Sequence, residues 1–148
     1  MSYGGIYVAQ IALGANEKQT LDALREAESF DGPSLVIGYG PCVGHGIDLR
    51  NGPARQKAAV ESGYWPLFRF DPRNPSKGLP ELSLDSFEPT ATVESFMDAE
   101  NRFKALRRGD PERAERLVAQ AQTQADIRWR RLENLATAAP EEEDDGWG

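Results

Sequence analysis

The sequence has 148 residues, enough for one compact domain, since domains usually hold roughly 100–200 residues. Hydrophobic residues make up 39% of the sequence, an ordinary content from which a core can form. The net charge of −7 argues against a nucleic-acid partner, because proteins that bind nucleic acid normally do so through a basic face. No apolar run approaches the roughly 18 residues that cross a membrane, and residues 1–14 lack the regions of a signal peptide. A single cysteine cannot form an internal disulfide. We therefore expect a cytoplasmic protein without membrane or nucleic-acid partners.

The first third of the chain predicts a strand–helix–strand unit. Residues 6–13 (IYVAQIAL) form a short apolar run typical of a buried strand. Asn16 is the expected N-cap of the next helix, with Gln19 completing a capping box, and residues 31–33 (DGP) end it. Its expected apolar face holds Leu21, Leu24 and Ala27. Residues 34–39 (SLVIGY) predict a second strand, parallel to the first and joined to it by a right-handed crossover.

A glycine-rich loop follows the second strand. This loop, residues 40–46 (GPCVGHG), lies at the strand's carboxyl end, where open α/β sheets place their ligands. Residues 53–61 predict another helix. Residues 65–70 (WPLFRF) predict a third strand, and Pro66 places it at an edge or at the start of that strand because proline has no amide hydrogen to donate.

The second half predicts a loop and a helical arm. Residues 74–91 are rich in proline and predict an extended surface loop with one short strand at 82–84. Residues 92–139 predict helices, and residues 140–148 predict a disordered acidic tail. A 3.6-residue spacing predicts one helical face that holds Val93, Phe96, Met97, Glu100 and Phe103, with Leu106 continuing its apolar side. A long helix should begin at Pro111 after the Asp110 N-cap, with an apolar stripe of Ala114, Leu117, Val118, Ala121, Ala125, Trp129, Leu132 and Ala136.

The predicted fold class is therefore α/β. A short parallel sheet of about three strands, within residues 1–73, is flanked by helices and followed by the helical C-terminal arm. Parallel strands with continuous apolar runs need cover on both faces, and the two predicted helices near them give little cover. The α/β part thus looks like a piece of a larger domain whose other strands lie beside it.

Cys42 is the first candidate for chemistry. A lone cysteine is often only a small buried hydrophobic residue. Its position between Gly40 and Gly44 favours a second interpretation, because backbone amides in such a loop can stabilise a thiolate or sulfide. An iron–sulfur cluster takes four thiolates, so that interpretation requires cysteines from outside this chain.

Other candidates are weaker. His45 lies three residues after Cys42, but a zinc site needs three or four protein ligands, so a hydrogen-bonded loop histidine is the simpler interpretation. Gly38-x-Gly40 lacks the rest of a dinucleotide-binding fingerprint. A thiol-redox function is disfavoured because there is no second cysteine and no adjacent basic residue to lower the thiol pKa. Asp48 and Arg50 are read as solvated charges, and Tyr64, Trp65, Phe68 and Phe70 as core or interface aromatics.

The order of these segments resembles the last part of the pyruvate:ferredoxin (flavodoxin) oxidoreductases. The resemblance extends to about Leu135, and the run at 62–69 (SGYWPLFR) is its most specific part. The matching stretches are 7–10 (YVAQ), 14–16 (GAN), 31–37 (DGPSLVI), Pro41-Cys42 with His45-Gly46, 59–73 (AVESGYWPLFRFDPR), 84–86 (LDS) and 100–103 (ENRF).

The resemblance implies a function for the assembled enzyme. Such enzymes cleave pyruvate with coenzyme A to acetyl-CoA and carbon dioxide, and pass two electrons through iron–sulfur clusters to ferredoxin or flavodoxin. Residues 1–73 would be the C-terminal part of a three-layer domain that binds thiamine diphosphate and Mg²⁺. Cys42 matches the last of four cysteine ligands of the [4Fe–4S] cluster nearest the thiamine cofactor. No catalytic residue of the family falls within this chain.

The missing ligands define the expected partner. The other three cysteines and the Gly-Asp-Gly motif that holds Mg²⁺ and diphosphate would lie upstream, in the remainder of the oxidoreductase, whose complete form is expected to be a homodimer. This chain would then be inactive alone, either as a split subunit or as a fragment that starts at an internal methionine, Met1. The alternative is a non-catalytic remnant or interaction module that keeps the fold and docks through its helical arm.

Overall fold

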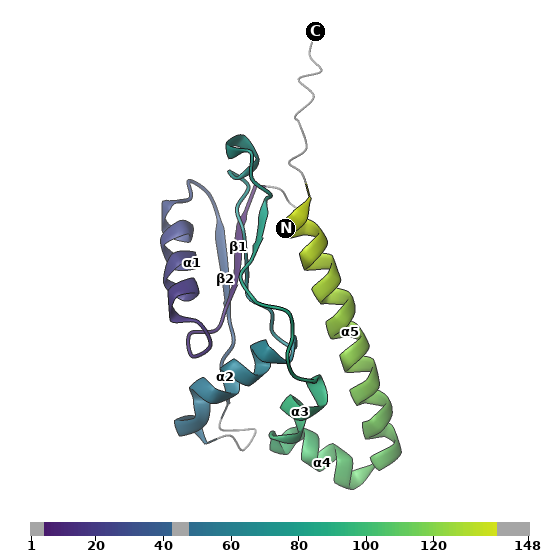
Figure 1. The fold of residues 1–148 in the computed structure, drawn as a ribbon. Coiled ribbons are helices and arrows are strands. Elements are labelled where there is room, and N and C mark those ends of the chain that lie inside the picture. The colour runs from purple at the N-terminus through teal and green to yellow at the C-terminus, as the bar shows by residue number, and fades with distance from the viewer. Residues whose placement is uncertain (1–4, 43–47, 139–148) are drawn as a thin grey trace.

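The computed structural model describes residues 5–42 and 48–138. Figure 1 shows a small sheet between one helix on its left and a long helix on its right, with shorter helices at its lower end. In chain order the elements are β1 (Tyr7–Ile11), α1 (Glu17–Ser29), β2 (Ser34–Gly38), a 3₁₀ turn (Leu49–Asn51), α2 (Gly52–Glu61), β3 (Phe68–Phe70), a 3₁₀ turn (Pro75–Lys77), β4 (Leu82–Leu84), α3 (Val93–Asp98), α4 (Asn101–Gly109) and α5 (Pro111–Thr137).

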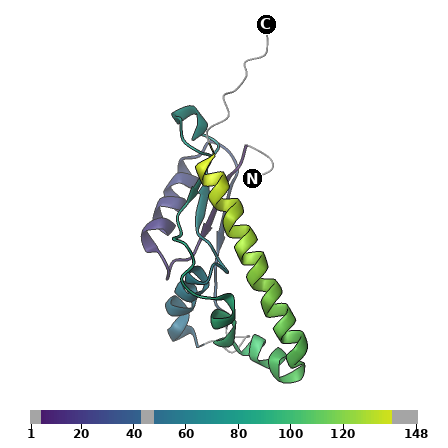
Figure 2. The same ribbon diagram turned by 45° about the vertical axis from the view of Figure 1, so that its right-hand side comes forward.

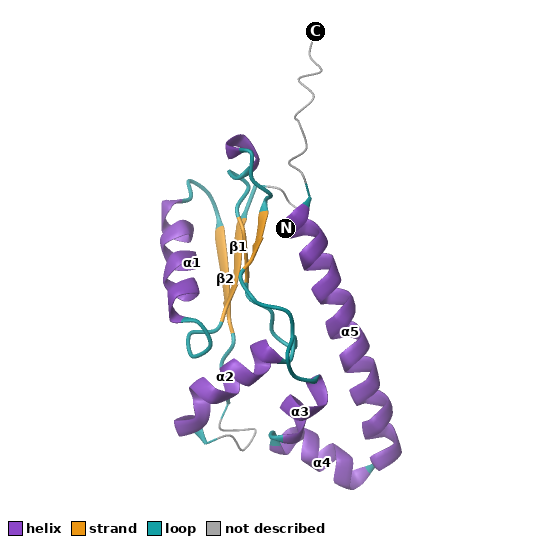
Figure 3. Cartoon of the chain, viewed as in Figure 1, coloured by secondary structure: helices purple, strands orange, loops and turns teal. Residues whose placement is uncertain are grey.

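The sheet has four strands in the order β2-β1-β3-β4 (Figure 3). β1 and β2 are parallel, with Tyr7 opposite Ser34 and Ile11 opposite Gly38, which confirms the predicted strand–helix–strand unit. The α/β class, the flanking helices and the C-terminal helices are also confirmed. The short strand predicted at residues 82–84 is present as β4.

The sheet is mixed, however, and not parallel throughout. β3 runs antiparallel to β1, and β4 runs antiparallel to β3. The reason lies in the position of α2, which follows β2 and lies beyond the carboxyl ends of β1 and β2 rather than along a face of the sheet (Figure 1). The chain leaving α2 therefore enters the sheet from that end, and β3 has to run back toward the start of β1.

One face of the sheet packs against α1. Tyr7 and Ala9 of β1 form a buried cluster with Ala23 of α1. The predicted N-cap is confirmed, since the Asn16 side chain accepts a hydrogen bond from the Gln19 amide at 2.9 Å. The predicted capping box is wrong, because the Gln19 side chain donates instead to the Gln10 carbonyl and to Asp85. These two tertiary hydrogen bonds use the Gln19 side chain that the capping box would have needed.

The predicted apolar face of α1 is only partly buried. Ala23 is fully buried, but Leu21 and Leu24 are 47% and 49% exposed. Glu26 forms an ion pair with Arg69 of β3, so the flank of α1 that carries Glu26 faces the middle of the sheet. At 100° per residue, Leu24 lies on the opposite side of Ala23 from Glu26 and therefore points toward the free edge of β2. Leu21 lies about 160° from Ala23, on the side of α1 that faces away from the sheet.

The other face of the sheet packs against the last part of α5. Figure 2 shows α5 running from the short helices at the lower end up along the sheet. Its Leu132 joins a buried cluster with Val8, Phe68, Phe70 and Leu82. Lower down, Ala125 of α5 packs with Val93, Phe96 and Met97 of α3 and with Ala59 of α2. The predicted stripe is thus largely confirmed, except that Leu117 is exposed.

β2 lies at an edge of the sheet, and its side chains Leu35 and Ile37 are exposed. Among the described residues β2 pairs with β1 alone, so its other edge has no neighbouring strand. Leu35 is 52% exposed and Ile37 is 37% exposed. We call Leu24, Leu35 and Ile37 the β2-edge surface. An unpaired strand edge bordered by large apolar side chains is the state that folded proteins normally avoid.

Candidate functional site

The segment that leads to Cys42 is fixed at the carboxyl end of β2. The Tyr39 amide donates to the Ile11 carbonyl at 3.0 Å, which extends the pairing with β1 by one residue. The Gln56 side chain of α2 donates to the Tyr39 carbonyl at 2.7 Å. The Trp65 indole donates to the same Ile11 carbonyl at 3.0 Å. The backbone that carries Cys42 into solvent is therefore anchored up to Tyr39.

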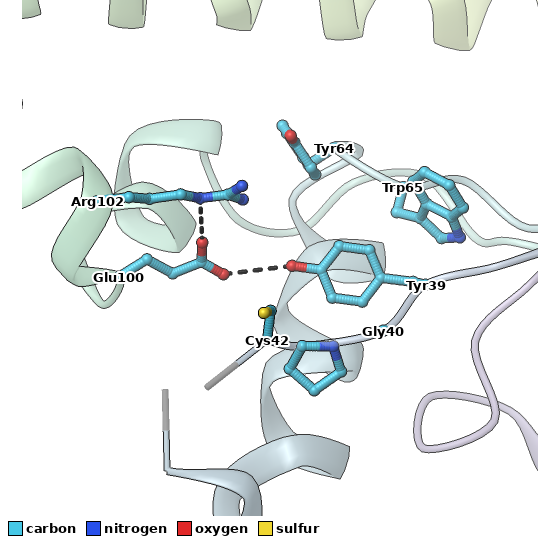
Figure 4. A pocket seen from close by; sticks show the side chains of 8 residues that line it. Tyr39, Gly40, Cys42, Tyr64, Trp65, Glu100 and Arg102 are labelled. Carbon is cyan, nitrogen blue, oxygen red and sulfur yellow. Dashed lines mark hydrogen bonds and ion pairs between the residues drawn. The ribbon is translucent and has the colours of Figure 1, made fainter. Parts of the chain in front are cut away.

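A hollow of about 160 Å³ lies beside this segment (Figure 4). It brings together the end of β2, the turn after α2, and the start of α4. The free thiol of Cys42 is exposed at this site, whereas most of the other lining side chains are buried or half-buried. The lining residues are Tyr39, Gly40, Pro41, Cys42, Tyr64, Trp65, Glu100 and Arg102.

A buried carboxylate forms part of the wall of this hollow. Glu100 is 0% exposed. The Tyr39 hydroxyl donates to its Oε1 at 3.2 Å, and the Arg102 Nε donates to its Oε2 at 2.8 Å. Arg55 of α2 places its Nη2 3.7 Å from Oε1, close enough for an ion pair but not for a hydrogen bond. We call Glu100, Tyr39, Arg55 and Arg102 the Glu100 network.

The network keeps the Tyr39 hydroxyl protonated. Burial, together with the charge and the hydrogen bond of Glu100, raises the pKa of Tyr39 to about 12. Tyr39 is therefore a neutral hydrogen-bond donor at any physiological pH. Its ring also contacts Trp65 at a centroid distance of 5.5 Å and Phe96 at 6.4 Å, so aromatic packing holds it in place.

The chain is similar to a segment of several pyruvate-flavodoxin and pyruvate:ferredoxin oxidoreductases. No protein-family model matches the sequence. The chain is 49% identical to the pyruvate-flavodoxin oxidoreductase of Nostoc sp. over 137 residues, 93% of its length. It is 48% identical to the corresponding enzyme of Rhodospirillum rubrum over 143 residues, 97% of its length, and 44% identical to the pyruvate:ferredoxin oxidoreductase of Moorella thermoacetica over 136 residues, 92% of its length.

The chain is homologous to one segment of these oxidoreductases. It spans only 11% of the length of the Nostoc enzyme and 12% of the other two. The same segment occurs in enzymes named for flavodoxin and for ferredoxin. The electron acceptor named for an enzyme therefore does not follow from the presence of this segment.

Among the predicted site residues, Cys42, Asp48 and Arg50 lie on the surface of the described part of the chain. Cys42 is exposed, so it is not the small buried hydrophobic residue of the simpler interpretation. His45 and Gly44 lie outside the described residues. Asp48 and Arg50 pair with each other at 2.7 Å on the surface.

Cys42 cannot make a metal site with neighbours in the described ranges. Residues 5–42 and 48–138 contain no group of three or more histidine, cysteine or acidic side chains placed to hold a metal ion. The described part of the chain therefore offers one exposed cysteine thiol, that of Cys42.

Within residues 5–42 and 48–138, no helix is both long enough and apolar enough to cross a membrane.

Sequence reasoning missed the role of Glu100. Glu100 falls on the predicted apolar helical face with Val93, Phe96 and Met97, and all four residues are buried. A carboxylate on a buried face has to be paired, because an isolated buried charge costs several kcal/mol. That conflict was the available sign of a buried ion-pair network. Its partners could not be foreseen, because Tyr39 and Arg55 come from 61 and 45 residues earlier in the chain.

Proposed function

We propose that this chain is the segment of a pyruvate:ferredoxin or pyruvate-flavodoxin oxidoreductase that supplies one ligand, Cys42, to a [4Fe–4S] cluster. The complete enzyme would convert pyruvate and coenzyme A to acetyl-CoA and carbon dioxide in the cytoplasm, and pass electrons to ferredoxin or flavodoxin. Thiamine diphosphate and Mg²⁺ would be held by the remainder of the enzyme. The observation that carries the proposal is the exposed Cys42 thiol beside a hollow at the carboxyl end of a parallel strand.

The residues near Cys42 fit one ligand of such a cluster. A [4Fe–4S] cluster takes four thiolates, and this chain can donate only one, so three must come from elsewhere. At Gly40 an added Cβ would meet no heavy atom within 4 Å, which leaves open space at the backbone two residues before Cys42. When bound, the cluster would supply electron transfer, while this chain holds one iron through Cys42 and limits the movement of the segment that carries it.

The β2-edge surface supports the proposed partner. Parallel sheets in α/β domains have helices on both faces and rarely end in a bare apolar strand. Here an unpaired strand edge is bordered by three large apolar side chains, each between 37% and 52% exposed. The relatives are roughly eight to nine times longer than this chain, so they contain the sequence that could cover that edge. We infer that β2 pairs with a strand from the remainder of the oxidoreductase and that the chain is inactive alone.

The test is a segment exchange followed by iron analysis. This chain replaces the matching segment of the Nostoc oxidoreductase, and the chimera is purified anaerobically. Cys42→Ala is expected to lose about four iron atoms per chain and the EPR signal of one cluster. Thr123→Ala, which changes an exposed α5 residue, is the matched control and should keep both.

One result decides against the ligand role. Equal iron content and equal EPR signals in Cys42→Ala and Thr123→Ala would refute the assignment of Cys42. If the chimera assembled with that result, the chain would act as an interaction module that keeps the fold without contributing to the cluster.

A further inference from the structure

The Glu100 network connects the Cys42 segment to the helices behind it. Tyr39 belongs to that segment, three residues before Cys42. Arg55 lies on α2 and Arg102 lies on α4. The Glu100 carboxylate joins all three, so a single buried side chain ties the end of β2 to two helices.

Tyr39 is the point at which this connection reaches Cys42. Its main chain is bound by the Ile11 carbonyl on one side and by the Gln56 side chain on the other. Its hydroxyl is bound by Glu100. The side chain and the backbone of Tyr39 are thus both fixed, and only Gly40 and Pro41 separate it from Cys42.

The network also carries an unbalanced charge. Two guanidinium groups, Arg55 and Arg102, face one carboxylate, so the net charge is positive. Arg55 is bound mainly by other groups, since its Nη2 donates to the Phe96 carbonyl at 2.7 Å and its guanidinium lies 5.0 Å from the Phe96 ring centroid. Its Nε is buried without a hydrogen-bond partner among the described residues. Glu100 is fully buried and Arg102 is one-third exposed, so solvent screens these charges only in part.

We propose that the Glu100 network is the positioning unit of the Cys42 ligand and that its charge helps to set the reduction potential of the bound cluster. This inference rests on the proposed function. A cluster becomes more negative by one charge when it gains an electron. A nearby carboxylate therefore lowers its potential and a nearby guanidinium raises it. Removing Glu100 or Arg102 should move the potential in opposite directions.

The experiment measures that potential in the chimeric enzyme by redox titration followed by EPR. Glu100→Gln keeps the shape of the side chain and removes its charge. We expect the ratio of reduced to oxidised cluster at a fixed ambient potential to rise about tenfold, which corresponds to about 59 mV for a one-electron couple. Glu94→Gln, on an exposed glutamate of α3 that pairs with Arg107, is the matched control and should leave the ratio unchanged.

Arg102→Gln tests the opposite sign. It should lower the ratio of reduced to oxidised cluster, by less than the change in Glu100→Gln because Arg102 is partly exposed. Its matched control is Arg107→Gln, which removes a partly exposed guanidinium of the same helix that pairs with Asp98 rather than with Glu100. Shifts of the same sign in Glu100→Gln and Arg102→Gln, or no shift in either, would overturn the electrostatic part of the proposal.

Tyr39→Phe tests positioning without changing any charge. We expect faster hydrogen exchange at the Gly40 and Cys42 amides than in the unmodified chimera, since the hydroxyl bond to Glu100 is lost. Unchanged exchange would overturn the positioning part, and it would do so even if Glu100→Gln failed to fold. Failure of the proposed function is a separate result, because it appears as retained iron in Cys42→Ala.

Discussion

When a partner covers the β2-edge surface, the burial of its leucine side chains should contribute to the free energy of binding. Fully burying a leucine side chain contributes about 1.5–3 kcal/mol. Leu24 and Leu35 are 49% and 52% exposed, so about half of that, roughly 1 kcal/mol each, remains to be gained when a partner covers them. Replacing both with glutamate should remove about 2 kcal/mol of binding free energy, a loss of about 30-fold in affinity. Burying unpaired carboxylates adds further cost, so 30-fold is a lower limit.

The assay compares binding with folding. The double variant Leu24→Glu/Leu35→Glu and the unmodified chain are titrated by sedimentation against the Nostoc oxidoreductase lacking its matching segment. The free energy of unfolding of the variant should fall by no more than about 1 kcal/mol, because both side chains can reach water in the separate chain. Leu135→Glu on α5, where the leucine is 48% exposed, is the matched control and should bind normally. Equal affinity of all three proteins would refute the assignment of β2 as the joining edge.

Two further predictions concern the stability of the chain itself. Leu132→Ala should lower the free energy of unfolding, measured in urea, by about 2–5 kcal/mol. The reason is that Leu132 is only 5% exposed within the cluster between α5 and the sheet. The control Leu135→Ala, at a half-exposed leucine, should lower the free energy of unfolding far less. Burial alone would raise the pKa of Asp71, but hydrogen bonds and charge from Arg73 outweigh it and hold that pKa below its ordinary value of 3.8. This contribution to stability is complete well above that ordinary pKa and is lost as the pH falls through the lower folded-state pKa. Asp71→Asn should therefore be less stable than the unmodified chain at pH 7, and the difference should shrink in strong acid; an unchanged difference would contradict this.

Local signals in the sequence predicted the elements well. The apolar runs of β1 and β2, the Asn16 N-cap and the Asp110-Pro111 start of α5 all depend on residues within a few positions of one another, and each is present in the structure. The direction of β3 could not be predicted in this way. It depends on α2 lying beyond the end of the sheet, which is a matter of tertiary packing rather than local propensity.

Exposure was the second property that the sequence alone could not supply. Helical spacing predicted that Leu21, Leu24 and Ala27 share one face of α1, but spacing does not show whether a partner for that face lies within the same chain, and both leucines are about half exposed. The opposite case is Glu100, a charged residue that the same kind of spacing placed on a buried face and that is buried because Arg102 and Tyr39 satisfy it. Both cases show that periodicity predicts which residues share a face, while the contacts of that face are set by distant segments.

The two incomplete features of this chain lie at the same strand. Cys42 follows the end of β2 by four residues and, in the proposed function, needs three further ligands from elsewhere. Among the described residues, β2 has no neighbouring strand on one side. Neighbouring strands in a sheet are about 4.8 Å apart. A strand added parallel to β2 would end at the same edge of the sheet as β2, so the loop that follows it would begin close to Cys42. One segment of the remaining enzyme could therefore complete the sheet and bring further ligands to the cluster. On this argument, variants of the β2-edge surface that weaken assembly should also lower cluster content, although none of them touches Cys42.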